Sequence, residues 1–278
     1  MRIDGNTELI AHLGYPTHSF KAPLIYNPYF ESTGINALVV PMACEHEPFE
    51  RVLKSFFELR NARGALITMP HKVSVVSLLD EVSAAVRVSG ACNAVKRLAD
   101  GRLAGDQFDG QGFVRGVRSQ GVALGGKRCL VVGCGGVGRA IAASLAEEGV
   151  SEIALHDTSP PAVADLAQRL RLHYPRLTVS VVGNDPHGFD LVVNATPLGM
   201  QEGDLLPMDA QRLQRGTLVG DVVMRSAMTP FLRAAQERAC KVQVGTDMLF
   251  EMIPAYLEFF GLPVATPERL RALARLDH

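Results

Sequence analysis

The stretch that decides the fold is KRCLVVGCGGVGRA, residues 127–140. An apolar run ends there at a cluster of glycines with the spacing GxGxxG. In a strand–turn–helix unit the first glycine permits a tight turn, the second lets a pyrophosphate approach the backbone, and the third allows close packing of strand and helix. The stretch therefore predicts a dinucleotide-binding unit. The residues expected to contact the cofactor in this turn are Gly133, Gly135, Gly136, Val137 and Gly138.

One acidic residue bears on which dinucleotide binds. Asp157 ends the next predicted strand, IALHD, and follows Gly133 by 24 residues. An acid near this spacing accepts hydrogen bonds from ribose hydroxyls, whereas a carboxylate repels the 2′-phosphate of NADP. The first basic residue after Asp157 is Arg169, half a helix away. We therefore expect NAD in preference to NADP. The alternative role of Asp157 is to cap the helix that follows it.

The loop NATPLGM, residues 194–200, follows the apolar strand DLVV. Ligands of open α/β sheets bind at the carboxyl ends of the strands, so this loop can line the ribose and nicotinamide of a cofactor. An ordinary turn built on Pro197 and Gly199 explains the same residues equally well. The candidate cofactor contacts in the loop are Asn194, Thr196, Gly199 and Met200.

Apolar strands alternate with amphipathic helices along nearly the whole chain. This alternation predicts two α/β domains with mainly parallel sheets and right-handed crossovers. Before residue 109 we expect strands at 8–14, 36–44 and 65–69, helices at 23–34 and 48–64, and one hairpin over 91–107. Gly34 and Gly64 are expected to end the two helices, and another helix is expected to begin near Lys72. A second series follows, in which a helix at 113–121 precedes the glycine-rich turn.

Composition excludes several classes of function. The 278 residues carry a net charge of −1 and no long basic run, so we expect no nucleic-acid partner. There is no signal-peptide core and no uninterrupted apolar stretch of about 18 residues, which predicts a cytoplasmic protein without a membrane partner. Five cysteines without a CxxC pair and eight scattered histidines predict neither a disulfide scaffold nor a metal site. The expected assembly is a monomer or a homodimer.

A series of motifs, taken in order, resembles the shikimate dehydrogenase family. The motifs are GYPTHSFKAPLIYN, GALITMPHK, GACNAV, GDQFDGQGF, GCGGVGRA, NATPLGM, MTPFL and GTDMLFEM, and they cover the chain from about residue 9 to residue 262. The resemblance implies a substrate-binding domain of residues 1–109 plus 245–278, a Rossmann-like NAD-binding domain of residues 110–244, and a cleft between them. It also implies cofactor contacts by Val223, Gly245 and Met248.

The resemblance assigns the catalytic pair to Lys72, from the PHK motif, and Asp109, from the DG motif. Oxidation of a secondary alcohol removes a hydride from carbon and a proton from oxygen, so the protein must supply an acid–base group. A lysine beside a carboxylate can do this, because a cleft can shift its pKa toward the working pH. A position facing the cleft also accounts for a cation where a helix N-terminus would favour negative charge.

The resemblance further implies substrate contacts by Thr68 and Asn93, although strand pairing alone would also explain Asn93. Several other pocket residues depart from the family pattern. The residues that stand in place of family residues are Leu66, Gln107, Phe108, Met224 and Met252. Each lost donor to a charged or hydroxyl group is worth roughly 1.5–3 kcal/mol if nothing replaces it.

The largest departure concerns two serines that bind the substrate carboxylate in the family. Aligned without gaps, these positions are Phe20 and Ala22. A shifted alignment lets Ser19 stand in for one serine, with His18 and Lys21 as new donors. The departures make the reaction type a firmer prediction than the substrate.

The predicted function is NAD-dependent interconversion of shikimate, or a close hydroaromatic analogue, with its 3-dehydro ketone. Quinate, an amino-shikimate and a less polar cyclic alcohol are alternative substrates, because the departures lie in the pocket. A protein that senses NAD(H) without catalysis is a further alternative. The presence of both Lys72 and Asp109 disfavours that alternative.

Overall fold

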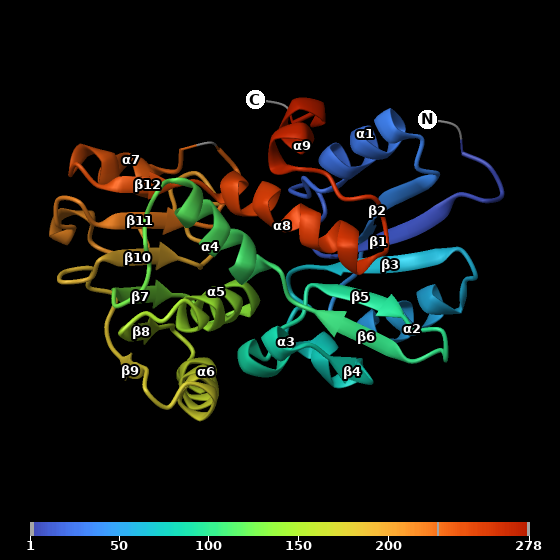
Figure 1. The fold of residues 1–278 in the computed structure, drawn as a ribbon. Coiled ribbons are helices and arrows are strands. Elements are labelled where there is room, and N and C mark those ends of the chain that lie inside the picture. Colours follow the sequence, from blue (N-terminus) through green and yellow to red (C-terminus); the bar gives the residue numbers. More distant parts are fainter. Residues whose placement is uncertain (1–2, 227, 277–278) are drawn as a thin grey trace. The chain divides into compact units, whose positions relative to one another are not determined.

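The computed structural model describes residues 3–226 and 228–276, which form two compact units (Figure 1). Each unit has its own sheet, so the predicted α/β class with a Rossmann-like parallel sheet is confirmed. Asp109 and residues 245–252 belong to the second unit, where the expected division put them in the first. Unit 1 contains residues 3–86, 91–108 and 253–276, and unit 2 contains residues 87–90, 109–226 and 228–252.

The described part of unit 1 has a six-stranded sheet in the order β2-β1-β3-β5-β6-β4. β1 pairs in parallel with β2 and β3, while β5 and β6 form the predicted antiparallel hairpin. The sequence pattern did not predict β4, because two residues show no periodicity. The strands are β1 (Glu8–Gly14), β2 (Ala37–Ala43), β3 (Ala62–Ile67), β4 (Glu81–Val82), β5 (Ala94–Arg97) and β6 (Leu103–Asp106).

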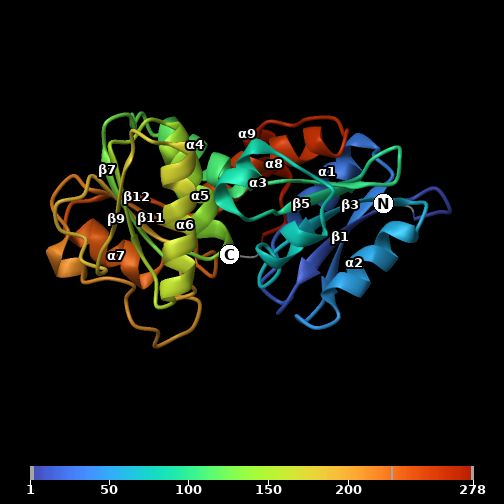
Figure 2. The ribbon, with the colours of Figure 1, turned by 90° about the horizontal axis from the view of Figure 1, so that it is seen from below.

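Helices cover both faces of this sheet, with α1 and α2 on opposite faces (Figure 2). As predicted, α1 begins with a proline, whose missing N–H is harmless there, and ends at Gly34, which has a left-handed φ of 70°. Two helices, α3 and α8, have residues in both units. The helices are α1 (Pro23–Thr33), α2 (Phe49–Glu58), the 3-10 helix η1 (Ser74–Leu78), α3 (Ala84–Ser89), α8 (Gly245–Phe259) and α9 (Pro267–Leu273).

One predicted helix boundary is wrong. α2 ends at Glu58, and Gly64 lies inside β3 and closes no helix. A Cβ on Gly64 would stand 2.5 Å from Cδ1 of Phe260 and 3.1 Å from the carbonyl oxygen of Val95. The glycine is needed for this close approach. Glycine is favoured both at the end of a helix and where another group approaches the backbone closely. The sequence pattern around Gly64 did not distinguish these two causes.

The segment around Lys72 also differs from the expectation. The helix after β3 is the short η1, which begins only at Ser74. The carbonyl oxygen of Lys72 accepts a hydrogen bond of 2.7 Å from the amide of Cys92. Nε2 of the neighbouring His71 lies 2.7 Å from the carbonyl oxygen of Cys44. Lys72 therefore lies in a loop that neighbouring segments hold, and not in the first turn of a helix.

The sheet of unit 2 has six parallel strands among the described residues, in the order β12-β11-β10-β7-β8-β9. The strand order reverses between β10 and β7, and ligands of open α/β sheets bind at such a switch point. The sequence pattern did not predict the three-residue β12. The strands are β7 (Arg128–Val132), β8 (Glu152–His156), β9 (Thr178–Val181), β10 (Leu191–Asn194), β11 (Leu218–Asp221) and β12 (Lys241–Gln243).

Three helices of unit 2, α4 to α6, lie on one face of the sheet and α7 on the other (Figure 2). Apolar clusters fill the space on each side, with Ile141 and Leu166 in one and Phe231 in the other. α4 begins at Asp109, before the expected start at Phe113, because glycines obscure the helical pattern of its first turn. The helices are α4 (Asp109–Ser119), α5 (Gly136–Glu147), α6 (Pro160–His173), η2 (Ala210–Arg212) and α7 (Pro230–Glu237).

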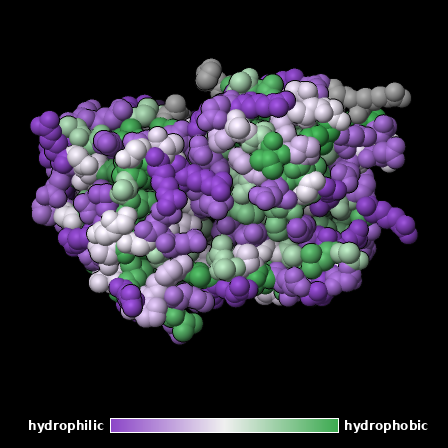
Figure 3. Space-filling view, viewed as in Figure 1, coloured by the Kyte–Doolittle hydropathy of each residue, from purple (hydrophilic) through white to green (hydrophobic). Residues whose placement is uncertain are grey.

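The described surface is mixed in character. Figure 3 shows hydrophilic side chains interspersed with small apolar groups over the face that it draws. Within residues 3–226 and 228–276, no helix has the length and apolar character needed to cross a membrane. The same residues contain no group of three or more His, Cys, Asp or Glu side chains placed to hold a metal ion.

We predict that Gly64→Ala lowers the free energy of unfolding by about 1–3 kcal/mol, because the new methyl group overlaps the Phe260 ring and the Val95 carbonyl. Gly183→Ala is the matched control, since a Cβ there would meet no atom within 4 Å. Urea denaturation of the three proteins measures the effect. Equal stability of the two variants would contradict the packing role given to Gly64.

Candidate functional site

The glycine-rich turn of unit 2 joins β7 to α5 at the switch point. Gly133 has a φ of 104°, and a Cβ on it would stand 2.6 Å from the carbonyl carbon of Ala195. A Cβ on Gly138 would stand 2.9 Å from the carbonyl carbon of Gly133. Only glycine fits these positions, because backbone on the facing side cannot move aside. The turn has the geometry that the sequence predicted for a pyrophosphate-binding loop.

The N-terminus of α5 is open toward a ligand. Its N-cap is Gly135, and no side chain of the described residues caps the helix. A Cβ on Gly135 would meet no atom within 4 Å, so there is space above the turn. The first amides of α5, including those of Gly136 and Val137, and the helix dipole are therefore available to an anionic group.

Asp157, which directly follows β8, accepts a hydrogen bond from the backbone of this turn. Its Oδ2 accepts a hydrogen bond of 2.6 Å from the amide of Cys134, and its Oδ1 accepts one of 2.8 Å from the amide of Ser159. Ser159, and not Asp157, is the N-cap of α6. A cavity of about 190 Å³ lies beside the carboxylate, lined mostly by apolar side chains such as Val163 and Val181. The carboxylate and cavity fit a ribose and a flat apolar base.

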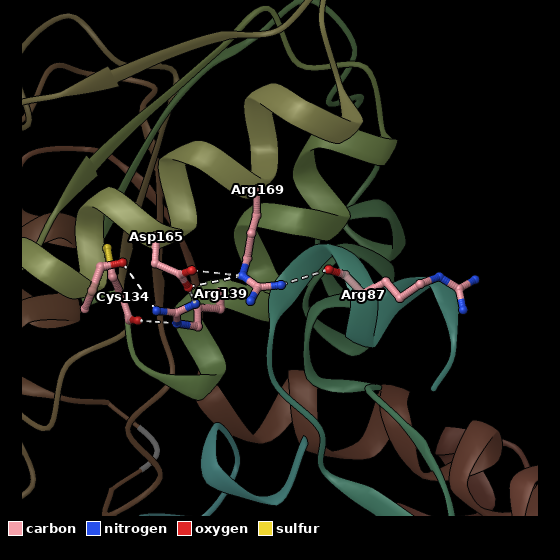
Figure 4. A network of polar contacts seen from close by, with 6 residues as sticks. Arg87, Cys134, Arg139, Asp165 and Arg169 are labelled. Carbon is pink, nitrogen blue, oxygen red and sulfur yellow. Dashed lines mark hydrogen bonds and ion pairs between the residues drawn. The ribbon is translucent and has the colours of Figure 1, made fainter. Parts of the chain in front are cut away.

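Two arginines near the turn are engaged with one carboxylate (Figure 4). Arg139 and Arg169 both pair with Asp165. Arg139 also donates to the carbonyl oxygen of Cys134 at 3.0 Å, and Arg169 donates to that of Arg87 at 3.2 Å. These cations therefore stabilise the scaffold of the turn.

The loop after β10 is fixed by its own polar groups. Oδ1 of Asn194 accepts hydrogen bonds from the hydroxyl and the amide of Thr196, at 2.6 and 3.0 Å. Nδ2 of Asn194 donates to the carbonyl oxygen of Leu198 and to Oδ1 of Asp221, both at 3.0 Å. Gly199 adopts a φ of 100°, as expected for a turn. Both readings of NATPLGM therefore describe the loop: it is a tight turn, and it lies at the switch point.

Sequence reasoning missed Asp221. This residue ends β11, is 1% exposed, and accepts hydrogen bonds from Asn194, the amide of Val223 and the hydroxyl of Thr229. Burial raises the pKa of Asp221 to about 6, against the opposite effect of these hydrogen bonds. A signal was available in the sequence: Asp221 is an acidic residue at the end of an otherwise apolar strand. Such a residue is a candidate for a functional site.

The remaining predicted residues of unit 2 lie after β11, in α8, in the loop after β10 and at the start of α4. Val223 and Gly245 are adjacent, since a Cβ on Gly245 would stand 2.8 Å from the carbonyl oxygen of Val223. Met248 and Met252 are buried in α8, where they face Gly112 of α4. Met200 lies at the end of the β10 loop, and its carbonyl oxygen accepts a hydrogen bond from Arg225. Asp109, the first residue of α4, is 1% exposed.

In unit 1, Thr68, Lys72 and Asn93 form what we call the strand-end cluster. The amide of Thr68 donates to the carbonyl oxygen of Leu13 at 2.9 Å, and the carbonyl oxygen of Asn93 accepts from Ile67 at 2.8 Å. Oδ1 of Asn93 accepts the amide of Phe108 at 3.0 Å. Among the described residues, the buried Nδ2 of Asn93 has no partner. Strand pairing therefore explains the backbone of Asn93 and leaves an amide donor for a ligand.

The loop between β1 and α1 carries the residues that depart from the family pattern. Ser19 and His18 are exposed, Phe20 is half-buried, and Ala22 is buried at the start of α1. Phe20 stacks on His12 of β1, with the ring centroids 4.0 Å apart. Sequence reasoning missed His12, because a histidine inside an apolar strand has no motif around it.

The fold of unit 2 and its glycine turn define the class: the chain is a dinucleotide-binding α/β protein of the Rossmann type. The family model for the shikimate dehydrogenase substrate binding domain matches residues 13–95. Over 278 residues the chain is 35% identical to a shikimate dehydrogenase (NADP(+)) of Rubrobacter xylanophilus, and the match covers 98% of each protein. The chain therefore belongs to the shikimate dehydrogenase family.

Solved structures agree with this membership. The chain is similar to shikimate 5-dehydrogenase from Listeria monocytogenes in complex with shikimate and NAD, with a TM-score of 0.87, 25% identity and 98% of each chain covered. It is also similar to quinate dehydrogenase from Corynebacterium glutamicum in complex with NAD, with a TM-score of 0.85, 27% identity, and coverage of 96% of this chain and 98% of that one. The protein is thus an oxidoreductase of the shikimate dehydrogenase type that uses a nicotinamide dinucleotide.

The raised pKa of Asp221 predicts a pH-dependent stability. The native state holds this proton up to about pH 6, whereas an unfolded chain releases it near pH 4. Between these pH values the native state binds more protons than the unfolded state. The contribution of Asp221 to the free energy of unfolding is therefore present at low pH and is lost as the pH rises from about 4 to about 6. We expect Asp221→Asn to abolish that contribution.

Urea denaturation at pH 4 and pH 7 measures the effect. The unfolding free energy of D221N minus that of the wild type should increase by about 2–3 kcal/mol between the two pH values. Glu202→Gln, at an exposed position, is the control and should show a constant difference. A constant difference for D221N as well would show that Asp221 titrates normally.

Proposed function

We propose that the protein interconverts a hydroaromatic secondary alcohol, shikimate or a close analogue, and the corresponding ketone, with NAD as the hydride acceptor. The observation that carries the proposal is the match of residues 13–95 to the substrate binding domain, because this segment contains the whole strand-end cluster. The names of the relatives support the substrate class, since two refer to shikimate and one to quinate.

In this proposal, Lys72 and Asp109 are the acid–base pair. The nicotinamide, when bound, supplies the hydride acceptor or donor. Lys72 exchanges a proton with the substrate oxygen, and its ammonium group stabilises the negative charge that develops there. Asp109 supplies the carboxylate of the proposed pair. Thr68 and Asn93 orient the substrate, the latter through its Nδ2 donor.

The preference for NAD rests on Asp157. Its carboxylate lies at the end of β8, beside the cavity that fits the base. A 2′-phosphate placed there would face a carboxylate, while Arg139 and Arg169 already pair with Asp165. The Listeria and Corynebacterium proteins are described with NAD, and the Rubrobacter relative is named for NADP(+). The charge at position 157 therefore supports NAD in this chain.

The choice among substrates depends on the loop between β1 and α1. Phe20 and Ala22 have no hydrogen-bond donor in their side chains, so they cannot hold a carboxylate as two serines would. Quinate, an amino-shikimate and a less polar cyclic alcohol are therefore tested beside shikimate. The assay is NADH or NADPH formation by the purified protein with each compound and each cofactor.

Lys72→Ala tests the acid–base role. We expect kcat to fall about 10²- to 10⁴-fold for whichever alcohol the wild type oxidises, because the proton acceptor is lost. The Kd of NAD should stay within about twofold, since Lys72 lies in unit 1 and the glycine turn in unit 2. Lys54→Ala, on the exposed side of α2, is the control and should behave as the wild type. Equal losses in kcat and NAD binding would refute the role.

Asp157→Asn tests cofactor choice with the smallest change of shape. Its amide oxygen can still accept a backbone hydrogen bond while the negative charge is removed. We expect kcat/KM with NADP to rise roughly 10-fold relative to that with NAD. Steady-state kinetics with both cofactors measure the ratio, and an unchanged ratio would remove Asp157 from the specificity argument.

A further inference from the structure

His12 is a buried polar side chain whose hydrogen bonding is incomplete. It lies in β1 opposite Leu66 of β3 and is 8% exposed. Its Nδ1 atom has no hydrogen-bond partner among the described residues. A buried imidazole in this state is less favourable than an apolar side chain of similar shape, so a group outside the chain is expected to complete its bonding.

The imidazole lies against the ring of Phe20, with centroids 4.0 Å apart and planes inclined by 26°. The pair lies where β1 ends, because a Cβ on Gly14 would stand 3.2 Å from Cζ of Phe20 and 2.6 Å from the carbonyl oxygen of Met69. Met69 lies in the loop that carries Lys72. The stacked pair therefore borders the strand-end cluster.

The surroundings keep the imidazole neutral. Burial lowers the pKa of His12 to about 3, and the positive charge of Lys72 acts in the same direction. A neutral imidazole donates from one ring nitrogen and accepts at the other, which suits a hydroxyl or carbonyl oxygen. A carboxylate instead forms its strongest hydrogen bonds with cations or several donors.

His71 shows a contrasting, structural use of histidine in the same unit. It is fully buried and, like His12, stacks on an aromatic ring, that of Phe49, with the ring centroids 3.8 Å apart. Its Nε2 lies 2.7 Å from the carbonyl oxygen of Cys44, a contact that ties the Lys72 loop to a neighbouring segment. Nδ1 of His71, like Nδ1 of His12, has no hydrogen-bond partner among the described residues. The two histidines differ because Nε2 anchors His71 to Cys44, whereas His12 borders the strand-end cluster.

We infer that His12 and Phe20 determine substrate specificity: the imidazole hydrogen-bonds an uncharged oxygen of the substrate ring, and the Phe20 ring covers an apolar face of that substrate. The inference rests on the proposed function, because it names the feature of a hydroxylated ring that the site recognises. A carboxylate on the substrate binds at donors other than His12.

Two substitutions separate the polar and the packing roles of His12. His12→Phe keeps a ring against Phe20 and removes the nitrogens, while His12→Asn places an amide near the position of Nδ1. We expect H12F to raise KM for the alcohol about 10- to 100-fold, with kcat within about threefold and an unchanged Kd of NAD. H12N should recover part of the loss. A wild-type KM in H12F would overturn the inference.

An acid and its methyl ester, such as shikimate and methyl shikimate, distinguish the two kinds of oxygen. If His12 binds an uncharged oxygen, H12F lowers kcat/KM by the same factor for both compounds. If His12 binds the carboxylate, the effect disappears for the ester, and the inference is wrong.

Failure of the proposed function has a different signature, because the wild type would then oxidise none of the hydroaromatic compounds. In that case ¹⁵N NMR of histidine-labelled protein with NAD decides the inference. The signals of His12, identified by their absence in H12F, are followed during titration with shikimate, methyl shikimate and quinate. A shift without protonation supports the inference, and signals that none of the three compounds moves overturn it.

Discussion

The close approach of two backbone segments at the switch point is the constraint on which unit 2 depends. No side chain fits on Gly133, because the carbonyl carbon of Ala195 would stand 2.6 Å from its Cβ. The glycine turn and the loop after β10 therefore hold each other in place. Asp157 fixes the same turn from β8, through its bond to the amide of Cys134, and Asp221 fixes the loop from β11. These contacts hold together the carboxyl ends of four neighbouring strands, β11, β10, β7 and β8. Because these strand ends are already ordered, binding of a cofactor costs less conformational entropy there.

In unit 1, hydrogen bonds between backbone groups place the candidate site residues. Its strand-end cluster is placed by backbone bonds between the ends of β1, β3 and β5, including that from Thr68 to Leu13. Two side chains at this edge are buried, and one nitrogen of each, Nδ2 of Asn93 and Nδ1 of His12, has no hydrogen-bond partner among the described residues. Buried polar groups that lack partners lower stability, and they are tolerated where function requires them. The rigid backbone of this edge therefore supports polar groups that are left available for a ligand.

The parts of the fold that the sequence predicted are those with local causes. The glycine turn, α1 and the hairpin each follow from spacing or periodicity within about a dozen residues. Gly64 was misread because its cause, the ring of Phe260, lies almost two hundred positions away in the chain. The same holds for the candidate site. The resemblance pointed to Lys72 and the spacing after the glycine turn pointed to Asp157, but His12 and Asp221 became visible only when distant strands were placed side by side. Burial of a polar group depends on non-local packing, and no local pattern records it.

The residues to which we assign cofactor and substrate specificity lie in different units of the chain. Asp157, which bears on the cofactor, belongs to unit 2, while His12 and Phe20, which bear on the substrate, belong to unit 1. Neither set coincides with Lys72 or Asp109, the residues to which the proposal gives the proton transfer. A change at Asp157 and a change at His12 or Phe20 therefore act on different units. The relatives of this chain carry names that differ in both cofactor and substrate, and one fold can accommodate both differences. Departures from the family pattern around Phe20 are thus compatible with the presence of Lys72 and Asp109.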